Sequence, residues 1–223
     1  MLIGVVGDHS TGKSTSFKYL DNKKTFIIDV KKEPLPWRGS ENDYNEGLRN
    51  YIRTSNWLDI LQIIENIAEK RPEIENIIVD DAGFIMSNEF FKRASESGFT
   101  KFSEIGQHMF KIVDACKALP NRLNVIFTFH RDVDKDALGE PIVRIKTIGR
   151  MIEEKYTLEA QFTVLLFSCV NYDKNGKADY KFVTNRTLNY PAKSPDGMFE
   201  DLYIDNNLQN VVTTMRKYYS SSE

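Results

Sequence analysis

Residues 7–15 read Gly-Asp-His-Ser-Thr-Gly-Lys-Ser-Thr and directly follow the apolar run 2–6. Two glycines separated by four residues, with Lys-Ser after the second, form the pattern G-x-x-x-x-G-K-[ST]. Backbone N–H groups approach phosphate oxygens where glycine leaves no Cβ in the way, and the N-terminus of a following helix adds partial positive charge. The stretch therefore predicts a strand, a loop and a helix built around a nucleoside triphosphate.

Each position of this loop has an expected role toward the cofactors ATP and Mg²⁺. Lys13 is expected to reach the β- and γ-phosphates. Ser14 is expected to offer its hydroxyl to Mg²⁺, a cation that prefers oxygen ligands, whereas Thr15 is a helical neighbour and not a second metal ligand. The predicted nucleotide-binding residues are Gly7, Asp8, His9, Ser10, Thr11, Gly12, Lys13, Ser14 and Thr15.

Composition narrows the class of protein. The 223 residues are 41% hydrophobic, which supports a sizeable core, and no linker or repeat divides them, so we expect one domain over 1–223. The net charge of −2 does not indicate a general electrostatic affinity for nucleic acid.

Cys116 and Cys169 lie in apolar runs and are interpreted as reduced core thiols. The chain lacks a basic leader and a membrane-length apolar run, which predicts a cytoplasmic protein without membrane contact.

Hydrophobic periodicity predicts alternating strands and helices. The predicted strands are 2–6, 25–30, 76–81 and 123–130, and the predicted helices are 14–20, 57–68, 105–119, 151–160 and 208–219. The stretch 82–104 is interpreted as a helix followed by a mobile loop. The strands are continuous aliphatic runs, typical of a buried parallel sheet with helices on both faces. The predicted fold class is therefore an α/β P-loop core with a mainly parallel sheet.

A β-hairpin is predicted near the C-terminus. The apolar runs 162–172 and 180–184 flank the pair Asn175 and Gly176. Both residues tolerate positive φ, which favours a two-residue type I′ turn. The fold is thus expected to end in a β-hairpin and an amphipathic helix.

Acidic residues stand at the ends of two predicted strands. Asp80 follows three aliphatic residues, so it is interpreted as the carboxylate that orients the Mg²⁺ shell opposite Ser14, over the alternative of a loop cap. Asp81 either polarises the attacking water or caps the next segment. Glu33, just past the second strand, is the other candidate base, although it also fits an exposed loop residue.

Polar and cationic residues follow the predicted strand 123–130. Thr128 and His130 alternate, so both point to one face of the strand, where a hydroxyl and an imidazole could sense the γ-phosphate. Lys146 and Arg150 could complete a neighbouring subunit's site, or they are surface charges. The candidate catalytic residues are Lys13, Glu33, Asp81, Thr128, His130, Lys146 and Arg150, and the candidate metal ligands are Ser14 and Asp80.

The order of these motifs resembles that of the RecA-like P-loop ATPases. The similarity rests on 7–15, on 77–80 and on the strand end 128–130. The later stretches 146–150 and 192–199 are similar to phage ATP-binding proteins proposed as RecA-like single-strand annealing ATPases. The resemblance covers nearly the whole chain, although the last two stretches have no role that the residues themselves reveal.

The resemblance implies a RecA-like ATPase core. It implies that Asp80 is the Mg²⁺-orienting acid, that His130 is the polar sensor at the strand tip, and that the loop after it faces DNA. One position departs from the family pattern, because Lys31 stands at the end of the second strand where a catalytic glutamate is expected, with Glu33 two residues on. The identity of the catalytic base is therefore left open.

The expected function is ATP hydrolysis in phage-type DNA recombination or single-strand annealing. We expect a homo-oligomer with the nucleotide at the subunit interface, and contact between single-stranded DNA and the cationic segment 131–150. The positive charges of this segment would then attract the phosphates of DNA, although the net charge of the whole chain is slightly negative.

Three other classes compete with this interpretation. A small-molecule or nucleotide kinase would use the same P-loop and needs an arginine-rich lid, for which 144–150 is a poor substitute. A non-enzymatic module could use ATP only to set its conformation. A GTPase is disfavoured, because 80–83 fits D-x-x-G but no N-K-x-D or T-K-x-D follows.

Overall fold

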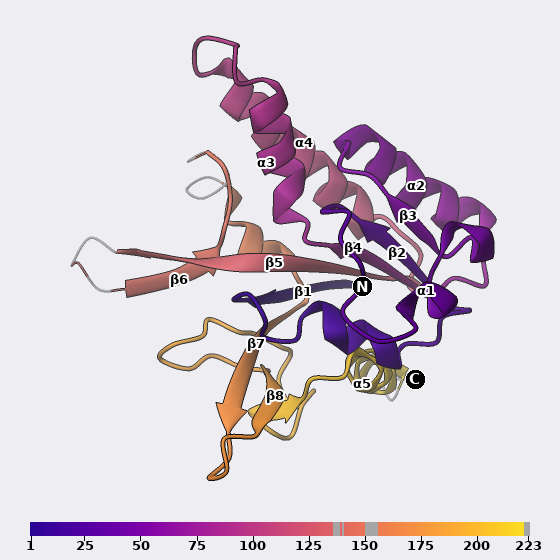
Figure 1. Ribbon diagram of the computed structural model, residues 1–223, viewed down its shortest axis with the longest axis vertical. Helices are drawn as coiled ribbons and strands as arrows, with labels where there is room; N and C mark the ends of the chain where they lie inside the picture. The colour runs from indigo at the N-terminus through magenta and orange to yellow at the C-terminus, as the bar shows by residue number, and fades with distance from the viewer. Residues whose placement is uncertain (136–138, 140, 150–155, 221–223) are drawn as a thin grey trace.

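The computed structural model describes residues 1–135, 139, 141–149 and 156–220, and Figure 1 shows its layers. Within these ranges nine strands form a sheet in the order β3-β2-β4-β5-β1-β7-β8-β9, with β6 paired to β5. The strands are β1 (Leu2–Gly7), β2 (Thr25–Asp29), β3 (Tyr51–Arg53), β4 (Asn76–Asp80), β5 (Asn124–Lys135), β6 (Pro141–Ile145), β7 (Val164–Tyr172), β8 (Ala178–Val183) and β9 (Tyr203–Asp205). The predicted α/β class with a mainly parallel sheet is confirmed.

Helices cover both faces of the sheet. They are η1 (Ser14–Tyr19), α1 (Ser40–Asp43), η2 (Glu46–Leu48), α2 (Trp57–Lys70), α3 (Gly83–Lys92), α4 (Thr100–Lys117), η4 (Leu158–Gln161) and α5 (Leu208–Ser220). The side chains of α2, α3 and α4 bury one face, whereas η1 and α5 bury the other, and the two groups lie on opposite sides of the sheet in Figure 1. None of the helices within the described ranges is long and apolar enough to cross a membrane.

The strand β1 shows why the sequence places it in the middle of the sheet. Its residues alternate between the two cores, with Leu2 and Val6 on the α2–α4 side and Ile3 and Val5 on the other. Every residue of the strand is buried, as expected when helices cover both faces. Because β1 pairs in parallel with β5 and β7, its carboxyl end lies at the same edge as theirs.

The register of the parallel strands gathers their last residues at one edge. Gly7 of β1 pairs with His130 of β5, and Asp29 of β2 pairs with Asp80 of β4. In open parallel sheets, ligands bind outside the carboxyl ends of the strands. The topology therefore defines the edge at which a ligand site is expected.

Several predicted elements differ from the structure in type or extent. The first helix is a 3-10 helix over η1 and not an α-helix. The helix α4 begins at Thr100, five residues before the predicted start, because the chain 93–99 forms a compact connection from α3. The charged stretch after His130 continues β5 to Lys135 and pairs with β6 as an antiparallel ribbon. In the predicted helix 151–160, residues 151–155 lie outside the described residues and η4 covers the end.

The C-terminal hairpin is confirmed, but its predicted type I′ turn is wrong. Only Gly176 of the two turn residues has a positive φ, of 76°. The N–H of Gly176 donates to the Asp173 carbonyl at 3.0 Å, and the N–H of Asp173 donates to the Lys177 carbonyl at 3.0 Å. This is a three-residue loop with a glycine bulge. The Asp173 side chain selects it by accepting from the N–H groups of Asn175 and Lys177, both at 2.8 Å.

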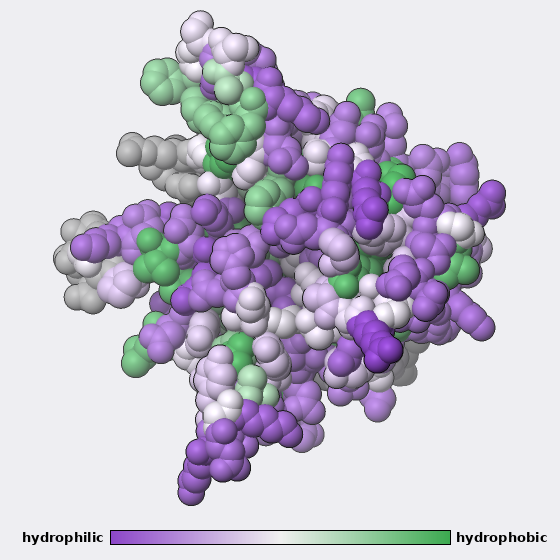
Figure 2. Space-filling model, viewed as in Figure 1, coloured by the Kyte–Doolittle hydropathy of each residue, from purple (hydrophilic) through white to green (hydrophobic). Residues whose placement is uncertain are grey.

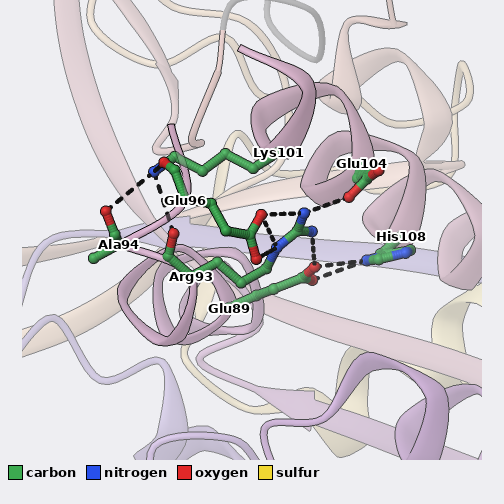
Figure 3. Close-up of polar contacts among 7 residues, drawn as sticks. All are labelled: Glu89, Arg93, Ala94, Glu96, Lys101, Glu104 and His108. Atoms are coloured by element: carbon green, nitrogen blue, oxygen red, sulfur yellow. Dashed lines mark hydrogen bonds and ion pairs between the residues drawn. The ribbon is translucent and has the colours of Figure 1, made fainter. Parts of the chain in front are cut away.

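The hairpin of α3 and α4 projects from the sheet, at the top of Figure 1. Figure 2 shows apolar surface at its tip, where Phe91 and Phe99 are 73% and 87% exposed. Figure 3 shows the polar network inside it, in which Arg93 contacts glutamates on both helices and on the connection between them, namely Glu89, Glu96 and Glu104. The network ties α3 to α4 by charge where few apolar side chains are buried.

Lys101 closes the connection between these helices. Its buried ammonium donates to the carbonyls of Arg93, Ala94 and Glu96, the last at 2.8 Å. Its stem lies beside the Phe90 and Phe102 rings, with the ammonium 5.3 Å from the Phe90 centroid.

We predict that Lys101→Met speeds amide hydrogen exchange in residues 93–100. The thioether preserves the apolar packing of the stem but donates no hydrogen bond to the three carbonyls, so the connection opens more often. Hydrogen exchange measured by mass spectrometry checks this, with Lys92→Met, an exposed position on the same hairpin, as the matched control. Equal exchange in both variants would contradict the role given to Lys101.

Candidate nucleotide-binding site

A cavity of about 290 Å³ lies at the carboxyl edge of β1, β2, β4 and β5. The loop after β1 forms its floor, the segment after β2 forms one wall, and the ends of β4 and β5 form the other. It is lined by His9, Ser10, Thr11, Gly12, Lys13, Ser14, Thr15, Asp29, Lys31, Glu33, Pro34, Leu35, Pro36, Asp80, Asp81 and His130. Seven of the nine predicted nucleotide-binding residues line it, and Gly7 and Asp8 lie directly before them.

The two glycines of the loop are required by close contacts. A Cβ on Gly7 would lie 2.1 Å from Ser168 Oγ on β7. Gly12 has φ +89°, and a Cβ there would lie 3.0 Å from the ring of Tyr180 on β8. Ser168 also shares a 2.6 Å hydrogen bond with Thr11 Oγ1. Its contribution to the loop is missed by sequence reasoning, because β7 is far away in the chain and becomes adjacent to β1 only in the sheet.

Lys13 is folded back against its own loop. Its ammonium donates to the carbonyls of Gly7 at 3.1 Å and Asp8 at 2.7 Å, and the side chain is buried. Burial lowers the pKa of Lys13, and the nearby carboxylates of Asp81 and Asp80 oppose that effect. Among the described residues, no carboxylate lies within 4.0 Å of this ammonium. A bound phosphate would therefore have to displace only the two backbone carbonyls, and no ion pair would be broken.

Three side chains connect the loop with the ends of β4 and β5. Asp80 Oδ1 accepts hydrogen bonds from Ser14 Oγ at 3.1 Å and from Thr128 Oγ1 at 2.6 Å. The Thr128 hydroxyl in turn accepts the N–H of Asp81 at 2.7 Å, and Asp81 has φ 54°, in the left-handed region. Thr128 is fully buried beneath the carboxylates and does not line the cavity, so it positions them instead of facing a phosphate.

The two neighbouring carboxylates have opposite pKa shifts. Burial, together with the charge of Asp81, raises the pKa of Asp80 to about 7, although Thr128 and Ser14 donate to it. Burial also acts to raise the pKa of Asp81, but contact with His130 and the charge of Lys13 bring it below its usual range. Asp81 is therefore ionised at neutral pH, whereas Asp80 is partly protonated there, and a cation beside Asp80 would favour its charged form.

His130, directly after the buried part of β5, lies between Asp81 and the His9 ring of the phosphate-binding loop. Its Nε2 is 3.3 Å from Asp81 Oδ1, its ring is 4.3 Å from the His9 ring, and Phe84 meets it edge-on at 5.8 Å. Within the described residues, neither buried ring nitrogen of His130 has a hydrogen bond of good geometry. The imidazole therefore has free hydrogen-bonding capacity at the predicted sensor position.

The segment after β2 contains Glu33, the other candidate for the catalytic base. Glu33 lines the cavity, but its carboxylate pairs with Lys31 at 2.8 Å and its side chain is 61% exposed. The carboxylate that ends β2 is Asp29, which is buried and accepts from Tyr51 Oη at 2.6 Å and from the N–H of Lys32 at 2.7 Å. Asp29 was not predicted as a site residue, and its bonds to β3 could not be read from the sequence.

Lys146, one of the two predicted cations, lies outside this cavity. Lys146 is exposed and lies beside His130, since its N–H donates to the His130 carbonyl at 2.9 Å, but it does not line the cavity. Arg150 lies outside the described residues. The cation that does reach the loop is Arg131, whose guanidinium pairs with Asp8 at 2.6 Å.

The donor set fits a nucleoside triphosphate with Mg²⁺. The cradle has no room for a Cβ at Gly7, the Lys13 ammonium has only carbonyl partners in the part of the chain that the structure describes, and the buried Asp80 carboxylate accepts a hydrogen bond from Ser14. Within the described ranges no three His, Cys, Asp or Glu side chains cluster as a complete metal cage. An ion here would thus take oxygens from Ser14, the nucleotide and water, as Mg²⁺ does.

This sheet, with its loop and paired acidic strand end, defines a P-loop nucleoside-triphosphate-binding protein of the ATPase type. Residues 1–195 match the family described as the AAA domain, and since this is most of the chain, the protein belongs to that family. Comparison with curated proteins finds no match. The narrower likeness to phage annealing proteins gains no support from these comparisons.

We predict that Asp80→Asn stabilises the protein at pH 8 in the absence of Mg²⁺ and nucleotide. The pKa of Asp80 is raised from 3.8 to about 7, so its contribution to stability is complete below about pH 4 and is lost as the pH rises to 7. The loss amounts to a few kcal/mol, at about 1.4 kcal/mol per pKa unit.

Thermal melts of both proteins at pH 8 and pH 4 measure this effect. The amide resembles the protonated acid, so the variant should melt higher at pH 8 and close to wild type at pH 4. Asp81→Asn is the matched control, and it should not gain stability at pH 8, because the pKa of Asp81 is lowered. A gap that is equal at both pH values would exclude a buried, protonated Asp80.

Proposed function

We propose that this AAA-domain protein binds and hydrolyses Mg-ATP as a RecA-like ATPase that acts on single-stranded DNA, in phage-type recombination or strand annealing. The observation that carries the ATPase part is the meeting of Lys13, Ser14 and Asp80 in one cavity. An ammonium, a hydroxyl and a strand-end carboxylate are the groups that phosphoryl transfer needs around the phosphates.

Each residue at this cavity has a separate role in the proposed hydrolysis. When bound, Mg²⁺ would neutralise charge on the β- and γ-phosphates. Lys13 would leave the loop carbonyls to bind the same oxygens, while Ser14 and Asp80 would hold the metal shell. Thr128 positions both Asp80 and Asp81 through its single hydroxyl.

Asp81 is a better candidate base than Glu33. Its carboxylate lines the cavity and is ionised, so it can orient an attacking water by accepting a hydrogen bond, and His130 Nε2 lies 3.3 Å from it. Glu33 is 61% exposed and its carboxylate pairs with Lys31 at 2.8 Å, so solvent and Lys31 surround it.

The DNA part of the proposal rests on local charge. The ribbon of β5 and β6 projects beside the site in Figure 1 and carries Lys135 and Arg144, with Lys146 just after it. Acidic residues on the same ribbon and the pairing of Arg131 with Asp8 reduce the positive field. We propose that oligomerisation, with the nucleotide at the interface between subunits, concentrates these cations along one strand of DNA.

A kinase is the second candidate, because a cavity of about 320 Å³ adjoins the nucleotide cavity. The two cavities share His9 and His130, and the second also contains Ser87, Arg131 and Lys146. An acceptor bound there would lie at the γ-phosphate end of the nucleotide.

We predict that Lys13→Ala abolishes ATP binding, whereas Asp80→Asn retains binding and lowers turnover by at least about a hundredfold. Removing the ammonium removes charge that meets the phosphates, while the amide leaves the cradle intact but no longer attracts the metal. Titration with a fluorescent ATP analogue and phosphate-release assays measure the two quantities. Normal binding by Lys13→Ala, or wild-type turnover by Asp80→Asn, would contradict the assigned roles.

We predict that single-stranded oligonucleotides bind with an affinity that falls steeply with salt, and that Lys146→Ala makes the slope shallower. Each phosphate contact releases about one counterion, so losing one contact lowers the slope by about one. Fluorescence anisotropy across a salt series measures the slope, and Lys174→Ala, on the exposed β7–β8 turn, is the control. A protein that stays monomeric and neither binds DNA nor changes its turnover with DNA would favour the kinase.

A further inference from the structure

A third cavity opens on the opposite side of the phosphate-binding loop. Its volume is about 610 Å³, and it lies between η1 and the strands β8 and β9. It shares Thr15 and Pro36 with the nucleotide cavity, so the two spaces meet across these residues. It is lined by Thr15, Lys18, Tyr19, Pro36, Ala178, Asp179, Tyr180, Asp205, Asn206 and Asn207.

The direction of the phosphate chain leads into this cavity. Lys13, Asp80 and Asp81 mark the γ-phosphate end of the nucleotide cavity, since the lysine of a P-loop reaches the β- and γ-phosphates. The nucleoside leaves from the other end, at the α-phosphate. Thr15 lies one residue past Ser14 and lines both cavities, whereas Lys13, Asp80 and Asp81 line only the nucleotide cavity of the two. The shape of the surface thus offers space for a nucleoside where the chain of phosphates ends.

Asn206, which lines this cavity, carries an unsatisfied donor. The residue is 9% exposed, and its buried Nδ2 has no hydrogen-bond partner among the described residues. A buried amide donor without an acceptor costs free energy, so such a group is expected to meet a ligand. Its Oδ1 lies 3.1 Å from the position that a Cβ on Gly12 would occupy, which places the amide against the loop.

Tyr180 stands beside Asn206 with part of its ring uncovered. The N–H of Asn206 donates to the Tyr180 carbonyl at 3.2 Å, which fixes the two residues side by side. The ring contacts Gly12 from β8, and the side chain is 43% exposed. An aromatic ring beside a phosphate-binding loop gives a flat base a surface on which to stack.

We propose that Tyr180 and Asn206 form a nucleobase subsite that selects adenine. The proposal rests on the binding of a nucleoside triphosphate by the loop 7–15. Adenine presents an amino donor next to a ring-nitrogen acceptor, which match the oxygen and the Nδ2 of the Asn206 amide. When the base presents its N7 edge, guanine offers two acceptors, N7 and O6, and leaves the amide oxygen without a donor. A guanine turned to present its N1–H and O6 would match the amide, so the comparison of ATP with GTP is the decisive measurement.

The test compares ATP, GTP and inorganic tripolyphosphate, each with Mg²⁺, by isothermal titration calorimetry. Wild-type protein should bind ATP at least about tenfold more tightly than GTP. Asn206→Leu and Tyr180→Leu should each weaken ATP binding at least about tenfold more than they weaken tripolyphosphate binding, because tripolyphosphate lacks the nucleoside whose contacts are lost, whereas any effect on the loop beside Gly12 is common to both ligands. Tyr172→Leu, 71% exposed on the same hairpin and outside the cavity, should bind all three as wild type does.

The possible outcomes distinguish a failure of the nucleobase subsite from a failure of nucleotide binding by the loop 7–15. If wild-type protein binds neither ATP nor tripolyphosphate, the nucleotide site itself is refuted. If it binds ATP and GTP equally, or if Asn206→Leu and Tyr180→Leu bind ATP as wild type does, the loop binds nucleotide but the subsite is wrong. Binding of tripolyphosphate also shows that a variant is folded, and if Asn206→Leu does not fold, Tyr180→Leu and the wild-type comparison decide.

Discussion

The site depends on the parallel register of β1, β4 and β5. This register sets Gly7 against His130 and pairs β4 with β5, so that residues far apart in the chain share one edge. A shift of one residue would move each side chain to the opposite face of the sheet, where it would meet different helices. The packing of the strands against helices on both faces thus holds the geometry of the candidate site as well as the fold.

One hydroxyl links that register to the chemistry. Thr128 donates to Asp80 and accepts from the N–H of Asp81, so β5 holds both ends of the acidic pair. The surroundings of the two carboxylates shift their pKa values in opposite directions, because burial favours a neutral Asp80 whereas His130 favours a charged Asp81. Two neighbouring carboxylates with pKa values moved apart are suited to different roles, one as a partner of a cation and the other as a base.

The phosphate-binding loop is supported from outside its own segment. Ser168 on β7 and Tyr180 on β8 contact the two glycines, and α5 packs against η1 on the same face. The C-terminal part of the chain therefore completes the site, although its strands lie on the far side of β1 from β4 and β5. This arrangement explains why the loop follows a central strand, where two neighbouring strands can hold it.

The sequence by itself determined the parallel α/β class, the loop 7–15 and the acidic strand end at Asp80, because these depend on local spacing and on continuous apolar runs. Tertiary structure decided what lies next to them. It placed Thr128 beneath the carboxylates, it paired Arg131 with Asp8, and it brought Asn206 to the loop. Sequence could not reveal these contacts, because each joins residues at least 47 positions apart and depends on which strands become neighbours.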